Sequence, residues 1–358
     1  MINFSFRRAL VSARFAAFLI LLCSVPLLQG CSSLNFIKRK VTVPPLLAPL
    51  VEADTAQLIN EINRVASVKS LRGKVDIQFL DTSFAKCGVA EKYRTADGTV
   101  IVERPGRVNL RIQVPFAGTD VAQMASDGER FQVAVLQGDT KYRRFVRGTN
   151  SSVYPKLETG GGGEADCGGG GEKKRAMTEQ RTVGALSGLR PQHFTDALLV
   201  RPVASDNSTY IYARSETFAE ERDDRKDAGR NARVVRGYYI LDELAPEGNG
   251  RARLSRRFWF DRFGTLRLAR LQTFDANGSI ATDVVYREPK SFGDAGRYNL
   301  PSRIELTRPQ DRYSIQISYQ TPGDVKTDEA YKPEIFVLQN RWQLPETDLD
   351  SRTQQSVK

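Results

Sequence analysis

Residues that could carry out catalysis are scarce in this chain. Its 358 residues include one histidine, His193, which stands near Pro191 at the expected start of a helix, where a structural role is usual. The sequence holds no nucleophile elbow, phosphate-binding loop or zinc-binding helix motif. The acidic pair Asp223-Asp224 lies in a charged run and is interpreted as solvated surface. The sequence therefore predicts a protein that is not an enzyme and uses no metal or cofactor, with a carboxylate site as the one catalytic alternative.

The first 30 residues have the pattern of a signal peptide. Arg7 and Arg8 give a basic start, and a 14-residue apolar run from Phe15 to Leu28 follows, which is short for a membrane span. The segment Leu28-Gln29-Gly30-Cys31 is similar to the lipobox of bacterial lipoproteins, whose cysteine thiol takes a diacylglycerol and becomes the new N-terminus. The alternative is a short hydrophobic segment that ends in a cysteine by chance.

Lipidation of Cys31 would anchor the mature chain to a membrane. Each buried methylene contributes about 0.8 kcal/mol, so two acyl chains hold a protein firmly. Ser32 stands where an aspartate would retain a lipoprotein in the inner membrane of enteric bacteria. We therefore expect a signal peptide over residues 1–30, a lipidated cysteine and proline-containing tether over 31–52, and a place on the periplasmic face of the outer membrane.

Two further cysteines, Cys87 and Cys167, would remain in an oxidising compartment. A disulfide between them would close a loop of about 80 residues, a contribution on the order of 4 kcal/mol in the chain-entropy model. Two unpaired thiols are the alternative.

The positive charge is spread along the chain. Removal of three signal-peptide arginines lowers the formal net charge from +11 to +8. Such diffuse charge is typical of a solvated surface, and we expect no nucleic-acid partner. Anionic lipid headgroups or cell-wall polymers suit it better.

Hydrophobic periodicity predicts a mainly β domain over residues 53–345. Residues 54–68 have helical spacing, with Asp54 and Gln57 as a capping box. Residues 71–79 then alternate apolar and polar side chains, as in a half-buried strand. Further strands are expected at 99–103, 108–114, 131–135, 142–146, 210–213, 234–241, 257–261, 266–274, 281–286, 303–307 and 313–319. Asp-Gly and Asn-Gly pairs between several of them favour hairpins.

Three segments interrupt or follow this pattern. A glycine-rich loop covers 159–171, and a charged insertion covers 220–233, interpreted as a solvated excursion. A polar tail covers 346–358. Between the two interruptions, an apolar stretch over 183–200 predicts a short helix that starts at Pro191.

The first half of the chain resembles the LolA/LolB family of lipoprotein carriers and receptors. The resemblance rests on the segment from Asp97 to Leu110 with its Arg104-Pro105, on Val114-Pro115, and on the run from Ser126 to Arg130. It implies an unclosed antiparallel β-barrel (half-barrel) with an N-terminal helix and a short helical lid. It also implies a cavity that takes acyl chains of lipids or lipoproteins, and a periplasmic carrier protein as a partner.

The resemblance and the alternation together give candidate site residues. The ligand-lining candidates are the apolar members of three strands: Val75, Ile77, Phe79, Leu110, Ile112, Val114, Phe131 and Val133. The lid candidates are Phe194, Leu198 and Leu199. Arg104 matches the family arginine that bonds the lid and gates the cavity; a surface arginine before a turn is the alternative.

A non-catalytic envelope scaffold is the second functional reading. A tethered β-protein with a filled core would show the same alternation, because apolar strand faces also pack as ordinary core. The mature chain is longer than the small members of the family. The two readings differ in whether an apolar ligand enters the domain.

Overall fold

Alternating side chains build β1 (Ser70–Asp81) as the sequence predicts. Leu71, Val75, Ile77 and Phe79 are buried, and the residues between them are half-buried or exposed. One face of the strand therefore belongs to the core and the other faces water.

The computed structural model describes residues 43–81, 91–92, 95–114, 117–137, 140, 143–150, 152, 191–204, 209–225 and 227–351. The chain divides into two units, Met1–Pro45 and Leu46–Lys358, and the second holds every element below. Cys31, Cys87, Cys167 and the glycine-rich loop lie outside the described residues. No helix in the described ranges is both long and apolar enough to cross a bilayer.

The other strands are β2 (Glu91–Lys92), β3 (Ala96–Glu103), β4 (Arg107–Gln113), β5 (Asp120–Ser126), β6 (Arg130–Val135), β7 (Arg144–Thr149), β8 (Ile211–Arg222), β9 (Arg233–Gly248), β10 (Arg251–Asp261), β11 (Arg267–Phe274), β12 (Ile280–Phe292), β13 (Tyr298–Arg308), β14 (Tyr313–Tyr319), β15 (Lys326–Thr327) and β16 (Glu346–Asp348). The helices are α2 (Thr55–Ala66) and α4 (Pro191–Leu198), with 3-10 turns η4 (Asp294–Gly296), η5 (Pro322–Asp324) and η6 (Pro333–Phe336).

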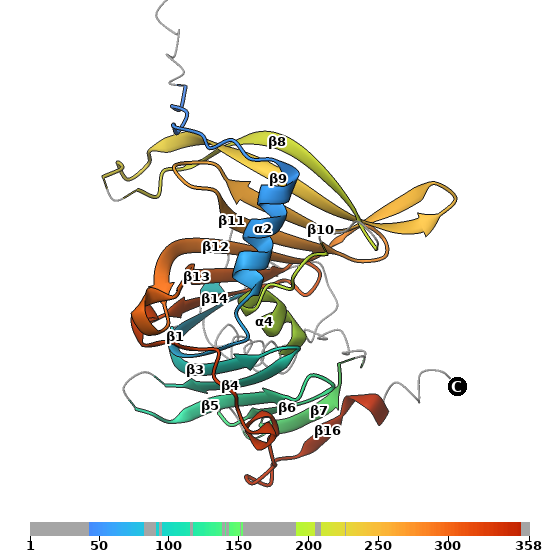
Figure 1. Cartoon of the computed structure of the whole chain (residues 1–358). Coiled ribbons are helices and arrows are strands. Elements are labelled where there is room, and N and C mark those ends of the chain that lie inside the picture. Colours follow the sequence, from blue (N-terminus) through green and yellow to red (C-terminus); the bar gives the residue numbers. More distant parts are fainter. Residues whose placement is uncertain are drawn as a thin grey trace, which may run out of the picture. The chain divides into compact units, whose positions relative to one another are not determined.

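These strands form one sheet in the order β16-β7-β6-β5-β4-β3-β1-β14-β13-β12-β11-β10-β9-β8, and β2 and β15 pair with β1 (Figure 1). Neighbouring strands are antiparallel except β16, which runs parallel to β7. In the part of the chain that the structure describes, no pairing joins the terminal strands β8 and β16. The expected mainly β, unclosed half-barrel is thus confirmed.

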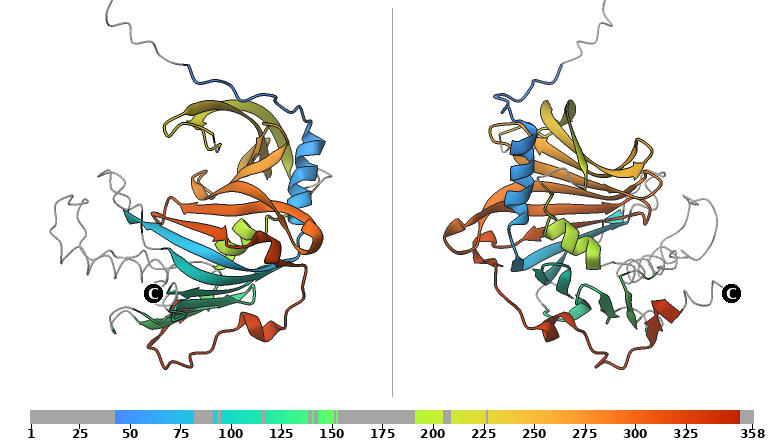
Figure 2. Two further views of the ribbon diagram at one scale, coloured as in Figure 1. Left: turned by 90° about the vertical axis from the view of Figure 1, so that its left-hand side faces the viewer. Right: turned by 45° about the vertical axis from the view of Figure 1, so that its right-hand side comes forward.

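Both predicted helices lie against the buried face of the sheet. Asp54 caps α2 in a complete capping box with Gln57, as expected. The apolar stripe of α2 is buried, and it joins residues of β1, β4, β10 and β13 in one continuous core. Figure 2 shows the sheet curling around α4, the yellow-green helix. α4 begins at the predicted Pro191.

The folded unit extends past both predicted limits. Residues 46–52, expected in the tether, pack on the sheet: Leu46 bridges Val235, Leu50 bridges Phe263, and the Leu47 side chain is 4% exposed. At the other end, Leu349 is buried next to β16, so residues 346–351 are not a free tail.

The charged insertion at 220–233 is also shorter than expected. Residues 220–222 continue β8, Arg233 begins β9, and Arg222 pairs with Arg233 in the ladder. Asp223 is buried and accepts hydrogen bonds from the Arg225 guanidinium, which lowers the pKa of this carboxyl to about 2. Most other side chains of the connection are exposed.

Acid is expected to release the C-terminal segment from β7. The Asp350 carboxylate accepts hydrogen bonds from the Ser152 hydroxyl, the Thr149 hydroxyl at 2.9 Å and the Thr149 amide at 3.0 Å, and these bonds lower the pKa of Asp350. A lowered pKa stabilises the fold above the unfolded value of about 3.9, and this contribution is lost as the pH falls through the folded pKa.

The measurement is amide exchange over 346–351, corrected for intrinsic rates. Exchange should rise between pH 5 and pH 3 in the native chain. Asp350→Asn should exchange fast already at pH 7. A native exchange rate that is the same at both pH values would contradict this role of Asp350.

Candidate functional site

The predicted lining residues form one buried apolar face. Strands β1, β4 and β6 carry seven of the eight candidates, each at most 8% exposed: Val75, Ile77, Phe79, Leu110, Ile112, Phe131 and Val133. β3 and β5 lie between these strands and add Val102 and Met124 to the same face. The alternation of the sequence thus identified one continuous surface.

Val114 does not belong to this face. It follows the last residue of β4 and is only half-buried. The ladder between β4 and β5 shifts register at Gln113, so the alternation that reaches Ile112 does not continue to Val114.

α4 covers this face with the predicted lid residues. Phe194 is 1% exposed, and Leu198 and Leu199 are 7% and 4% exposed. The helix contacts β3, β4, β5 and β13, so it spans strands from both halves of the chain. Its contacts with the sheet are mainly apolar.

Arg104 connects three segments at the edge of this cover. Its Nε donates to the Val68 carbonyl at 2.8 Å, and its Nη2 donates to the Val200 carbonyl at 2.7 Å. Val68 precedes β1 and Val200 follows α4. Burial lowers the pKa of Arg104, and the nearby Asp196 carboxylate opposes this effect. The planar guanidinium fork suits two carbonyls that a lysine could not reach together.

One further side chain bonds the end of α4, and another bonds the segment that follows it. The Tyr286 hydroxyl donates to the Ala197 carbonyl at 3.2 Å, and burial raises the pKa of this phenol, which keeps it a donor. The Asn63 amide exchanges two hydrogen bonds with the backbone of Val203, at 3.1 and 3.0 Å. The last carbonyls of a helix have no partner within it, so the Tyr286 hydroxyl fixes the end of α4.

Sequence reasoning identified Arg104 but missed Tyr286 and Asn63. Tyr286 occupies an inward position of a predicted strand, where a hydroxyl needs a buried acceptor. Asn63 lies in α2 next to the apolar stripe, and it belongs to no sequence motif that would mark it as functional. For both residues, the one sequence signal was a polar side chain at a position expected to face the core.

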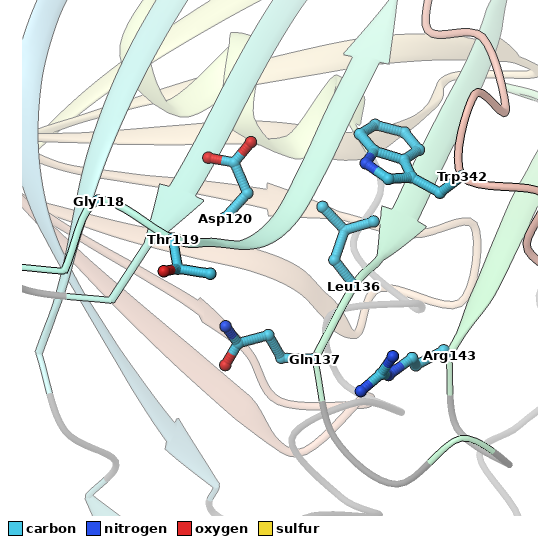
Figure 3. Close-up of a pocket in the computed structure, with 7 residues that line it drawn as sticks. All are labelled: Gly118, Thr119, Asp120, Leu136, Gln137, Arg143 and Trp342. Atoms are coloured by element: carbon cyan, nitrogen blue, oxygen red, sulfur yellow. The ribbon is translucent and has the colours of Figure 1, made fainter.

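The side chains that line the face beneath α4 are apolar. Among the described residues, no group of three or more His, Cys, Asp and Glu side chains could hold a metal ion. His193 lies in α4 itself. A surface pocket lies where β5 begins and β6 ends (Figure 3). Its lining combines polar and charged side chains, Asp120, Gln137 and Arg143, with the apolar Leu136 and Trp342.

No protein-family model matches the sequence, and no curated protein matches it significantly. Solved structures do resemble it. A LolA superfamily protein from Nitrosomonas europaea is 12% identical with a TM-score of 0.39, covering 80% of this chain and 99% of its own. A DUF1329 family protein from Desulfovibrio piger is 11% identical with a TM-score of 0.37, covering 79% and 95%.

A protein described as an outer membrane lipoprotein-sorting protein domain, from Vibrio parahaemolyticus, is 9% identical with a TM-score of 0.34 and covers 78% of this chain and 95% of its own. The structural neighbours of this chain thus include a LolA superfamily protein, a DUF1329 family protein and a protein of the lipoprotein-sorting type.

Proposed function

We propose that this chain is a lipid-anchored periplasmic protein that binds acyl chains of lipids or lipoproteins on the apolar face beneath α4. Cys31 carries the anchor, and the protein takes part in lipid or lipoprotein transport to the outer membrane, receiving cargo from a periplasmic carrier. Arg104 gates the face, and Phe194, Leu198 and Leu199 act as the lid. A disulfide between Cys87 and Cys167 remains part of the proposal.

One observation carries this proposal: a short helix covers a large apolar face and is fastened at its C-terminal end by a few hydrogen bonds. Burial contributes about 25 cal/mol per Å² of apolar area, so an acyl chain could replace the side chains of α4 without polar chemistry. The donors Arg104 and Tyr286 bond carbonyls at the end of α4 and just beyond it, and these bonds can break while the sheet stays intact.

A second function, a non-catalytic envelope scaffold, is favoured by a different observation. Val75, Val102, Val108 and Leu110 are each at most 2% exposed and belong to a core that also includes α2 and α4. A face that stays filled in this way would hold no ligand.

Replacing Leu198 by glutamate separates these functions. A carboxylate at this buried position would place an unpaired charge on the apolar surface that the acyl chain contacts, which penalises apolar binding. We expect the affinity for a fluorescent fatty acid to fall at least about tenfold, as expected for a loss of roughly 1.4 kcal/mol. The measurement is a fluorescence titration, with chemical denaturation on the same samples.

Leu47→Glu is the matched control. Leu47 is 4% exposed but lies outside the core beneath α4. It should lose stability and keep its affinity for the fatty acid within about twofold. If the two variants lose stability equally and neither changes fatty-acid binding, the scaffold function is supported.

A further inference from the structure

A second cavity lies where β11 and β12 separate. These strands pair from Arg270–Val285 to Phe274–Ile280, and no pairing joins them beyond Arg270 within the described residues. β11 continues alongside β10 as far as Arg267, and β12 continues alongside β13 as far as Phe292. The space between them is a slot of about 750 Å³, which α2 borders through Glu61, Arg64 and Val65.

The slot contains a buried cation with an unused donor. The Arg236 side chain is 10% exposed; its Nη1 bonds Asp261 at 2.6 Å and its Nη2 bonds Asp224 at 2.9 Å. Among the described residues its buried Nε has no hydrogen-bond partner, and the Glu221 carboxylate lies 4.0 Å from it, beyond hydrogen-bond distance. A buried guanidinium N–H without an acceptor is costly. A ligand oxygen in the slot would satisfy it.

Further positive charge surrounds Arg236. Arg267 shares the Asp261 carboxylate, and Arg287 reaches Asp224 only at 3.7 Å. Lys290 is exposed and has no ion pair among the described residues. Of the lining residues, seven are Lys or Arg and five are Asp or Glu. The surface that a ligand would meet therefore favours an anion.

The rest of the wall is apolar. The Trp259 ring packs edge-on against Tyr238, with centroids 5.7 Å apart, and the Arg270 guanidinium lies 5.4 Å from the ring. Leu268, Val285 and Leu300 add aliphatic surface. Small-molecule pockets are typically 300–1,000 Å³, so the slot is far larger than a single phosphate ion needs.

We propose that this slot binds an amphiphile with a phosphate headgroup. The headgroup bonds the Arg236 Nε and is surrounded by Arg267, Arg287 and Lys290, and the alkyl part packs against Trp259 and its aliphatic neighbours. Tyr286 both lines this slot and bonds the end of α4, but the residues that meet the headgroup take no part in the face beneath α4. The proposal therefore does not depend on the function proposed above.

The native chain offers a fluorescence probe for this site. It has two tryptophans, and Trp342 lies outside the slot, so Trp342→Phe leaves Trp259 as the sole reporter. The chain from residue 32, which contains the whole unit Leu46–Lys358, is titrated below the critical micelle concentration with dodecyl phosphate, inorganic phosphate and dodecyl maltoside. We expect a saturable change in Trp259 emission with dodecyl phosphate alone. An equal response to inorganic phosphate indicates a free-phosphate site, and an equal response to the maltoside indicates apolar binding only; either result overturns the proposal.

Variants locate the binding. The exposed pair Arg287→Ala/Lys290→Ala should weaken dodecyl phosphate about five- to tenfold without unfolding the protein. Arg253→Ala is the matched control, because Arg253 is a strand arginine that pairs with Glu247 outside the slot. Leu198→Glu should leave the Trp259 response unchanged, which separates this site from the face beneath α4. Equal affinities of the double variant and the Arg253 control would overturn the proposal.

Discussion

Replacing Arg104 by alanine is expected to loosen α4 and to destabilise the protein by about 2–4 kcal/mol. The variant loses two charge-assisted hydrogen bonds, to the Val68 and Val200 carbonyls, and each such bond contributes about 1.5–3 kcal/mol without being additive. The end of α4 then keeps the neutral donor Tyr286. The segment after it keeps the Asn63–Val203 pair and the bonds from Arg256 to the carbonyls of residues 201 and 202. Amide exchange over 191–203 should rise, and association with a fluorescent fatty acid should become faster.

Two other variants define what this result means. Arg107→Ala is the control, because Arg107 lies on the same hairpin and pairs with Glu103 at 3.4 Å in a part-exposed bridge. Its cost should stay below about 1 kcal/mol. Arg104→Lys keeps the positive charge but loses the planar guanidinium that reaches both carbonyls. Its loss of stability should lie between those of Arg104→Ala and Arg107→Ala. If α4 exchanges at the same rate in the Arg104 and Arg107 variants, Arg104 does not hold the lid.

Replacing Arg262 by methionine is expected to cost about 2–4 kcal/mol, since one buried charge holds the N-terminal segment on the sheet. The Arg262 side chain is 3% exposed; its Nε donates to the Val51 carbonyl at 3.1 Å and its Nη1 bonds Glu216 at 2.8 Å. It also bonds Glu52 and lies 4.2 Å from the ring centroid of Tyr239. The variant leaves the Val51 carbonyl without its side-chain donor and removes the cation–π contact.

Arg233→Met is the control for this substitution. Arg233 pairs with Glu220 on an exposed hairpin, and the two side chains are 54% and 49% exposed, so its cost should stay below about 0.5 kcal/mol. Chemical denaturation gives both free energies, and amide exchange over 46–52 reports release of the segment. If Arg262→Met and Arg233→Met lower the free energy of unfolding equally, Arg262 does not hold residues 46–52 on the sheet.

Periodicity predicted the strands with a clear apolar face and missed those without one. β14 has the predicted bounds, Tyr313–Tyr319, because every second side chain faces the core. β5 was not predicted: its last five residues are all buried, and its small side chains do not alternate with polar ones. β8 was predicted only in part, since its charged side chains face water and its register depends on pairing with β9.

Contacts between distant segments account for the other differences. Residues 46–52 carry no periodic pattern, and their position depends on distant partners such as Val235 and Arg262, the latter 211 positions from Val51. β16 has three residues and pairs with β7 across a similar separation. In the candidate site, alternation predicted the strand positions that are buried, and the family resemblance singled out Arg104, whose gating role stays a prediction. Tyr286 was missed because its acceptor, the Ala197 carbonyl, is 89 positions away.

The most direct test of the central proposal is native mass spectrometry of the chain from residue 32, purified from a bacterial periplasm and followed by lipid extraction. The account predicts a bound acyl-containing species that a competing fatty acid displaces, with its occupancy reduced in Leu198→Glu and kept in Leu47→Glu. A single ligand-free mass in every preparation, with no uptake of added fatty acid, would contradict the account and favour the envelope scaffold.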